Sequence, residues 1–157
     1  MRTVTILIAV GIVWLAEPDP VAGQSPNSQV MATIQQVFDG MRSANSIMVS
    51  AVFADDARFA VIRSKDGHAE ITTQPVFEWI GAIGESGGSW DERIYDVDIH
   101  IDGNVSSAWV PYTFYLEGVL SHCGVNSMEL LLNGDSWEIT QLSDTRRTKD
   151  CPDPLGG

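Results

Sequence analysis

The sequence has 157 residues, 44% of them hydrophobic, which is enough for one domain with an ordinary core. Its 21 acidic residues outnumber 9 lysines and arginines and give a formal net charge of −12. Because phosphate groups repel so acidic a protein, nucleic acid and anionic membrane surfaces are poor partners for it.

Residues 1–23 have the layout of a secretory signal peptide. A positive start at Arg2 precedes an apolar run from Val4 to Ala16 and small residues at Val21–Gly23. The run is shorter than the roughly 20 residues that a membrane-spanning helix needs. We therefore predict cleavage after Gly23, a secreted or periplasmic location, and no membrane attachment after cleavage. A buried N-terminal helix is the alternative.

Export would place the two cysteines, Cys123 and Cys151, in an oxidising compartment where they can pair. We predict this disulfide, which would tie the C-terminal tail to one of the later strands. Two free thiols are the alternative, and either state argues against a catalytic cysteine.

Two helices are predicted after a polar leader at residues 24–29. The first starts after Ser28 as its N-cap and ends near Arg42. Its apolar residues recur at helical spacing: Val30, Ile34, Val37, Phe38 and Met41. The second helix is shorter and is capped by Asn45 or Ser46. Its apolar positions are Ile47, Val49, Val52 and Phe53.

A hairpin and a third helix follow in the chain. The predicted strands cover residues 57–62 and 68–72, with a turn at residues 65–67 between them. Pro75 suits the first turn of the third helix, which ends near Gly84.

The segment from Trp90 to Ser143 predicts four consecutive strands. Three turn dipeptides divide it, at Asp102–Gly103, Glu117–Gly118 and Asn133–Gly134. Helices placed early in the chain can cover only one side of such a sheet. The predicted fold class is therefore α+β: a cone-shaped barrel in which three helices pack on a curved, mostly antiparallel sheet.

Two motifs resemble a known superfamily. The stretch from Val52 to Phe59 and the closing stretch from Asn133 to Ile139 are similar to the nuclear transport factor 2-like superfamily, in particular its SnoaL-like and ketosteroid-isomerase-like branches. The resemblance implies one domain over residues 30–145, followed by a tail at residues 146–157. It also implies a pocket inside the cone and frequent dimerisation. Members include isomerases, dehydratases, cyclases, epoxide hydrolases and binding domains, so the fold leaves the activity open.

Strand register predicts which residues face the pocket. If Glu117–Gly118 is a two-residue turn, Thr113 faces His122 and Trp109 faces Asn126. A matching turn at Asn133–Gly134 places Asn126 opposite Gln141. The same inner face then has an apolar end: Met128, Leu130, Trp137 and Ile139. A bulge at Pro111 would instead exchange the faces of Trp109 and Tyr112.

The outer face is predicted to carry Glu129 opposite Glu138, a like-charge pair that requires solvent. It would also carry an apolar group that a partner subunit could cover: Val110, Tyr112, Phe114 and Val125. We therefore predict a homodimer. At Asp102–Gly103 we favour a three-residue loop with a bulge, which turns Tyr95, Val97 and Ile99 inward.

His122 is the candidate catalytic residue, because an imidazole can act as acid, base or hydrogen-bonding anchor in a cavity. A structural histidine is the alternative. The candidate ligand-binding residues are Trp109, Tyr112, Thr113, Asn126 and Gln141. Asp144, Arg146 and Arg147 either close the rim of the pocket or, as we prefer, anchor the tail. No metal site or cofactor is predicted, since no metal-binding spacing or phosphate loop occurs in the sequence.

The resulting prediction is an exported protein that binds a small, partly apolar molecule. One alternative is a cofactor-independent isomerase, dehydratase or cyclase that uses His122. The other is a structural homodimerisation module.

Overall fold

A computed structural model describes residues 24–152. The predicted signal peptide therefore lies outside the described residues. Three helices and seven strands follow one another as α1 (Pro26–Arg42), α2 (Ser46–Ser50), β1 (Phe53–Lys65), β2 (His68–Pro75), α3 (Val76–Glu85), β3 (Trp90–Ile94), β4 (Asp98–Asp102), β5 (Val105–Leu116), β6 (Val119–Asn133) and β7 (Ser136–Arg146). None of the helices within these residues has the length and apolar character needed to cross a bilayer.

The first helix buries one apolar stripe against the sheet. Its N-cap is Ser25, whose hydroxyl accepts a hydrogen bond from the backbone N–H of Ser28. The predicted N-cap at Ser28 was therefore wrong, and the helix begins at Pro26. The predicted apolar stripe is confirmed, because all five members are buried: Val30, Ile34, Val37, Phe38 and Met41. The prediction was wrong for Ile47 in α2, which is 81% exposed.

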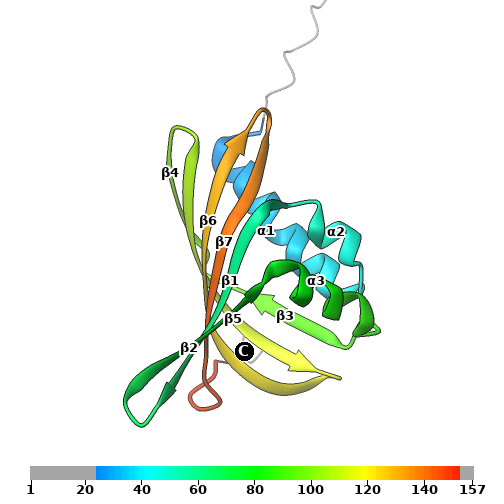
Figure 1. Ribbon diagram of the computed structural model, residues 1–157, viewed down its shortest axis with the longest axis vertical. Helices are drawn as coiled ribbons and strands as arrows, with labels where there is room; N and C mark the ends of the chain where they lie inside the picture. Colours follow the sequence, from blue (N-terminus) through cyan, green and yellow to red (C-terminus); the bar gives the residue numbers. More distant parts are fainter. Residues whose placement is uncertain (1–23, 153–157) are drawn as a thin grey trace, which may run out of the picture.

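The strands form one open sheet in the order β2-β1-β7-β6-β5-β3, with β4 also paired to β5. The pair β1–β7 is parallel and the other pairs are antiparallel. All three helices lie on one side of this curved sheet (Figure 1). The predicted α+β architecture is confirmed. The concave face carries the core, and the helices leave part of it uncovered.

The first predicted strand of the C-terminal block is in fact two strands. Asp96 adopts a φ of 46° between β3 and β4, and such a left-handed residue interrupts an extended strand. The turn after β4 contains Gly103 and Asn104 and has two residues, because Asp102 pairs with Val105. The three-residue loop was wrong, although Val97 and Ile99 do pack against the core as predicted.

Two bulges change the predicted register. Leu116 pairs with Val119 as expected, but Ser121 is an extra residue in β6, so Phe114 pairs with His122. A second shift separates Ile139 from Gln141 in β7. The last turn also differs, since Asn133 pairs with Ser136. One inserted residue moves every later side chain to the other face, because side chains alternate along a strand.

The inner and outer faces of β5 are therefore exchanged relative to the prediction. Val110, Tyr112 and Phe114 point into the core, whereas Trp109 lies outside and is 54% exposed. The alternation continues through Pro111, so the predicted bulge there is wrong. Four residues predicted for the apolar inner face are buried as expected: Met128, Leu130, Trp137 and Ile139.

The outer face of β6 and β7 carries the acidic residues predicted for it, but in a different register. Glu129 is exposed and pairs with Gln141, while Glu138 pairs with Leu131. Glu129 and Glu138 are therefore not cross-strand partners, and the predicted like-charge pair is wrong.

Candidate functional site

A cavity of about 1120 Å³ opens on the concave face of the sheet. Strand β1, helix α3 and the strands β3, β5 and β6 contribute to its lining, together with the end of β7 and the tail. Its apolar part is formed mainly by six residues: Val61, Trp79, Ala82, Trp90, Phe114 and Leu116. Aromatic rings pack against one another here. Trp90 meets Phe114 edge-on with ring centroids 6.1 Å apart. A flat or apolar molecule fits such a lining.

Glu92 is the buried acid of the cavity. It lies in β3 between Trp90 and Ile94, and it is only 8% exposed. The amide of Asn126 donates a hydrogen bond to Oε1 of Glu92 over 2.6 Å. Arg42 of α1 donates to the backbone carbonyl of Glu92 at 3.1 Å and so ties β3 to the helix. Burial raises the pKa of Glu92 to about 8, and the hydrogen bond from Asn126 offsets only part of that rise.

A second polar group lies where β5 and β7 approach each other. The Tyr112 hydroxyl donates to the backbone carbonyl of Thr145 at 3.0 Å and reaches Oδ2 of Asp144 at 3.5 Å. Arg146 donates from Nε to the same Asp144 oxygen at 2.6 Å. Burial raises the pKa of Asp144 despite this guanidinium. Burial also raises the pKa of Tyr112, so the phenol stays protonated.

His122 lines the cavity from β6. Its ring packs on Phe114 with centroids 4.9 Å apart and meets Tyr112 edge-on at 5.8 Å. The Nδ1 atom is 3.0 Å from the hydroxyl of Ser121. Burial, followed by the charges of Arg146 and Arg63, lowers the pKa of His122 to about 4. The imidazole is therefore neutral near pH 7. Its catalytic role stays a prediction.

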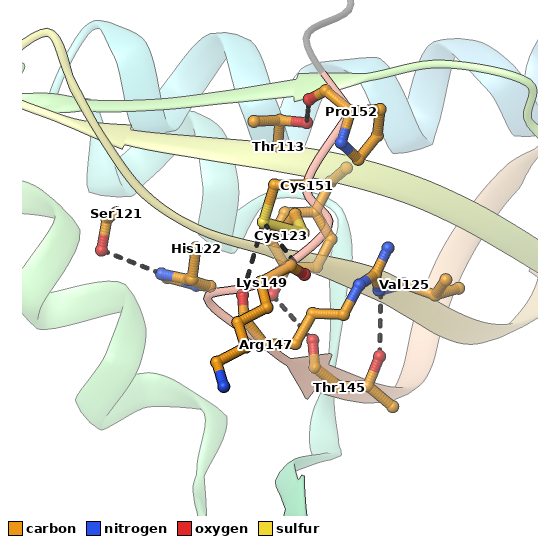
Figure 2. Close-up of a disulfide and its surroundings, with 11 residues drawn as sticks. Thr113, Ser121, His122, Cys123, Val125, Thr145, Arg147, Lys149, Cys151 and Pro152 are labelled. Carbon is orange, nitrogen blue, oxygen red and sulfur yellow. Dashed lines mark hydrogen bonds between the residues drawn. A yellow bond between two sulfur atoms is a disulfide. The ribbon is translucent and has the colours of Figure 1, made fainter.

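The C-terminal tail completes one side of the cavity, and a disulfide holds it there. Cys123 and Cys151 are bonded with their Cα atoms 5.5 Å apart, which confirms the predicted pairing. Backbone hydrogen bonds of 2.9 Å in both directions join Cys123 to Arg147. Figure 2 shows both Arg147 and Lys149 on the tail near the disulfide, with the guanidinium of Arg147 directed toward Val125 and away from His122. Both tail residues line the cavity.

The structure brings together only some of the predicted ligand-binding residues. Tyr112 and Asn126 are buried beside the acidic groups described above. Thr113 is buried on the opposite face, where its hydroxyl donates to the carbonyl of Pro152 at 3.0 Å. Trp109 is on the outer face, and Gln141 lies by a separate depression, hydrogen-bonded to a neighbouring serine. The two bulges account for all three displacements.

Sequence reasoning missed Glu92 and underrated Arg146. A signal for Glu92 was present, because Trp90 and Ile94 flank it at alternate positions and so predict an inward side chain. Arg146 lines the cavity instead of serving only the tail. The position of Arg146 was not visible in the sequence, because residues 141–146 follow the bulge in β7. The bulge determines which face of the sheet their side chains occupy.

Chemically, the site offers a neutral carboxyl, a neutral imidazole and a phenol next to aromatic rings. Glu92 can donate a hydrogen bond when protonated and accept a proton when ionised. Within residues 24–152, no group of three or more His, Cys, Asp or Glu side chains is arranged to hold a metal ion.

Comparison with solved structures identifies the fold. A nuclear transport factor 2-like protein from Shewanella baltica superposes with a TM-score of 0.63 at 16% identity, over 78% of this chain and 94% of that chain. A nuclear transport factor 2-like protein with a cystatin-like fold from Novosphingobium aromaticivorans gives 0.60 at 10% identity, over 78% and 82%. A candidate dehydratase of this family from Streptomyces avermitilis gives 0.57 at 13% identity, over 79% and 99%.

These likenesses show that the chain has the nuclear transport factor 2-like, cystatin-like fold, as the two sequence motifs predicted. No model of a protein family matches the chain, and no curated protein matches it. At such low identity the solved structures show the fold alone. Function must therefore be argued from the cavity itself.

Proposed function

We propose that the protein binds a small, partly apolar molecule in the cavity beside Glu92. The observation that carries this proposal is the joint placement of an aromatic lining and a buried carboxyl in one open cavity of about 1120 Å³. Ligand sites typically combine an apolar lining with a few placed polar groups. This volume is just above the range of about 300–1,000 Å³ that is usual for pockets of drug-sized ligands.

The rings of Trp79, Trp90 and Phe114 would contact the apolar part of the ligand. Glu92 would meet a polar atom of the ligand, since Asn126 occupies only one of its carboxyl oxygens. A protonated carboxyl donates a hydrogen bond that a carboxylate cannot, so Glu92 favours a ligand with an acceptor such as a carbonyl or ether oxygen.

The test uses a neutral apolar fluorophore, N-phenyl-1-naphthylamine, and a variant that fills the cavity. Ala82 lines the cavity from α3, so Ala82→Trp should weaken binding of the fluorophore at least tenfold. Ala69 is exposed on β2, and Ala69→Trp adds the same side chain outside the cavity. Binding should be unchanged in this control. Failure of the wild type to bind, or equal binding by Ala82→Trp, would overturn the proposal.

A catalytic role is the second candidate, and Glu92 favours it. A carboxyl with a pKa of about 8 can donate a proton near neutrality and take one back. This carboxyl suits a cofactor-independent isomerase, dehydratase or cyclase better than His122 alone, because the lowered pKa makes His122 a weak base. Native mass spectrometry of protein purified from its source would capture a ligand to assay. Turnover that survives both Glu92→Gln and His122→Ala would exclude this candidate.

We also propose that the chain is exported, with cleavage after Gly23. The Cys123–Cys151 disulfide supports this proposal, because disulfides persist in oxidising compartments. Mass spectrometry of the mature protein gives its first residue directly. A mature chain that retains residues 1–23 would contradict export by this route.

Finally, we propose a homodimer through the outer face of β5 and β6. Val110, Tyr112 and Phe114 no longer support it, since they lie inside. Three other apolar residues are exposed on the outer face: Val105 at 53%, Trp109 at 54% and Leu131 at 45%. Val105 and Leu131 pair across the two strands and form, with Trp109, an apolar strip that the Ser107–Glu129 pair interrupts. The dimerisation that the fold resemblance implies would cover this strip.

A further inference from the structure

Positive charge is concentrated around the cavity of an otherwise acidic protein. The whole chain has only 9 lysines and arginines and a net charge of −12. Four of these cations line the cavity: Arg63, Arg146, Arg147 and Lys149. The acidic residues of the lining are Glu78 and Glu92. Cations therefore outnumber acidic residues in the cavity lining, whereas acidic residues dominate in the whole molecule.

Three of the four cations form no ion pair. Arg146 is paired with Asp144. Among residues 24–152, no carboxylate lies within ion-pair distance of Arg63, Arg147 or Lys149. Arg147 pairs with Cys123 and directs its guanidinium toward Val125, so we name Arg63 and Lys149 the cationic rim. Away from the cavity, Arg42 and Arg93 are paired with carboxylates.

The fold brings the cationic rim together against electrostatic repulsion. Arg63 and Arg146 are direct partners in the parallel pair of β1 and β7, and both line the cavity. Like charges on neighbouring strands destabilise a sheet. Lys149 is added from the tail, which the Cys123 disulfide holds in place (Figure 2). An anion bound among these side chains would relieve the repulsion.

The acidic groups of the lining do not cancel this charge. Burial keeps Glu92 protonated near pH 7. Glu78 is exposed on α3, and within the described residues it forms no ion pair with the cationic rim. The net charge of the cavity lining is therefore positive.

We propose that the cavity takes an amphipathic anion, whose apolar body lies on the aromatic lining and whose carboxylate, sulfonate or phosphate meets the cationic rim. This inference rests on the proposed function and adds the class of ligand to it. It also assigns a role to the disulfide, which holds the segment that carries Lys149. Each cation within a few ångströms of the anion strengthens binding, and salt weakens this contribution.

The test compares two ligands of the same shape, 1-naphthaleneacetate and its neutral analogue 1-naphthaleneacetamide, by isothermal titration calorimetry. We expect the anion to bind at least tenfold more tightly at low ionic strength. This advantage should shrink between about 10 mM and about 150 mM salt, where the Debye length falls from about 30 Å to about 8 Å. Comparison with 1-naphthyl phosphate and 1-naphthalenesulfonate then ranks the anionic groups.

Charge variants locate the effect. Arg63→Gln/Lys149→Gln should remove most of the preference for the anion and leave binding of the amide unchanged. Arg58→Gln/Lys65→Gln changes the net charge equally, but neither residue lines the cavity. Its preference should match that of the wild type.

Each other result has a distinct meaning. Equal or tighter binding of the amide would overturn the anion preference and leave the proposed function standing. If both double variants lose the preference for the anion equally, the preference depends on net charge, and the role of the cationic rim is overturned. No binding of either ligand, together with no binding of N-phenyl-1-naphthylamine, would overturn the proposed function as well.

Discussion

Tyr112 and Gly124 lie opposite each other on β5 and β6, and the ring of Tyr112 occupies the space that a side chain at Gly124 would need. A Cβ atom at this glycine would be 3.1 Å from Cε1 of Tyr112 and 1.7 Å from the carbonyl oxygen of Thr145. That same carbonyl accepts the hydrogen bond of the Tyr112 hydroxyl. The absence of a side chain at Gly124 is thus what lets β5, β6 and β7 converge beside the site.

Gly124→Ala should therefore destabilise the protein. The backbone at Thr145 must move to admit the methyl group, and overpacking of this kind costs about 1–3 kcal/mol. Urea unfolding followed by circular dichroism measures the loss. The control is Gly81→Ala in α3, where nothing lies within 4 Å of the added atom. Helix propensity predicts a gain of up to about 1 kcal/mol there. A Gly124→Ala variant as stable as the wild type would contradict the predicted packing.

Stability should fall as the pH rises from about 6.5 to about 8. Glu92 has a pKa of about 8 in the folded chain against an ordinary value of 4.5, so the folded state holds a proton that the unfolded state has released. The stabilisation is fully present below pH 4.5 and is lost as the pH approaches 8. His122 contributes the opposite slope, but only between about pH 4 and its ordinary pKa of 6.5.

The variant Glu92→Gln tests whether Glu92 causes this pH dependence of stability. The amide keeps an acceptor for Asn126 and does not titrate, so the slope above pH 6.5 should flatten. Urea midpoints at several pH values, for the wild type and for the variant, give the comparison. A slope that persists in Glu92→Gln would contradict its assignment to Glu92.

Reduction of the disulfide should lower the free energy of unfolding by about 3.5 kcal/mol in the chain-entropy model, because the bond closes a loop with a sequence separation of 28. Unfolding with and without dithiothreitol measures this. The control is Cys123→Ala/Cys151→Ala, which should be insensitive to the reductant. Reduction should also release the tail from the cavity, although its backbone pairing with Cys123 opposes this. An unchanged unfolding midpoint on reduction would contradict the prediction and would mean that the other tail contacts hold the tail without the disulfide.

Trp109→Glu should give a monomer if two copies meet through the outer face of β5 and β6. The charge would be buried without a partner in the dimer, and such burial is costly. Light scattering over a range of concentrations reports the mass. Phe77→Glu is the matched control, because Phe77 is 69% exposed on α3 and lies away from the outer strip. A monomeric wild type would rule out the dimer.

The sequence predicted the helices and the order of the strands because these depend on local patterns. The stripe from Val30 to Met41 repeats at helical spacing, and a helix buries such a stripe wherever it packs. The Cys123–Cys151 pairing was also predictable, because the described chain contains no other cysteine. Trp90, Glu92 and Ile94 alternate, so even the inward direction of Glu92 was present in the sequence.

The positions of Trp109, Thr113 and Gln141 were not predictable in this way. The face of the sheet that each of these side chains occupies depends on the extra residues at Ser121 and near Thr140. Such bulges depend on the pairing with neighbouring strands, so the sequence of one strand does not show them. The turn was predicted at Asn133–Gly134 but lies at Gly134–Asp135. Its position is fixed by the pairing of Leu132 with Trp137, which is again a contact between two strands.

By itself, then, the sequence determined the α+β class, the apolar stripes of the helices, the disulfide and the acidic net charge, all of which follow from residue type and spacing. Only the tertiary structure decided which side of each long strand faces the cavity. It also decided that Glu92 and Asn126 meet, and that Arg63 of β1 and Lys149 of the tail line the same cavity. The physical reason is that these contacts depend on strand pairing between distant segments, where a one-residue shift reverses every side chain that follows.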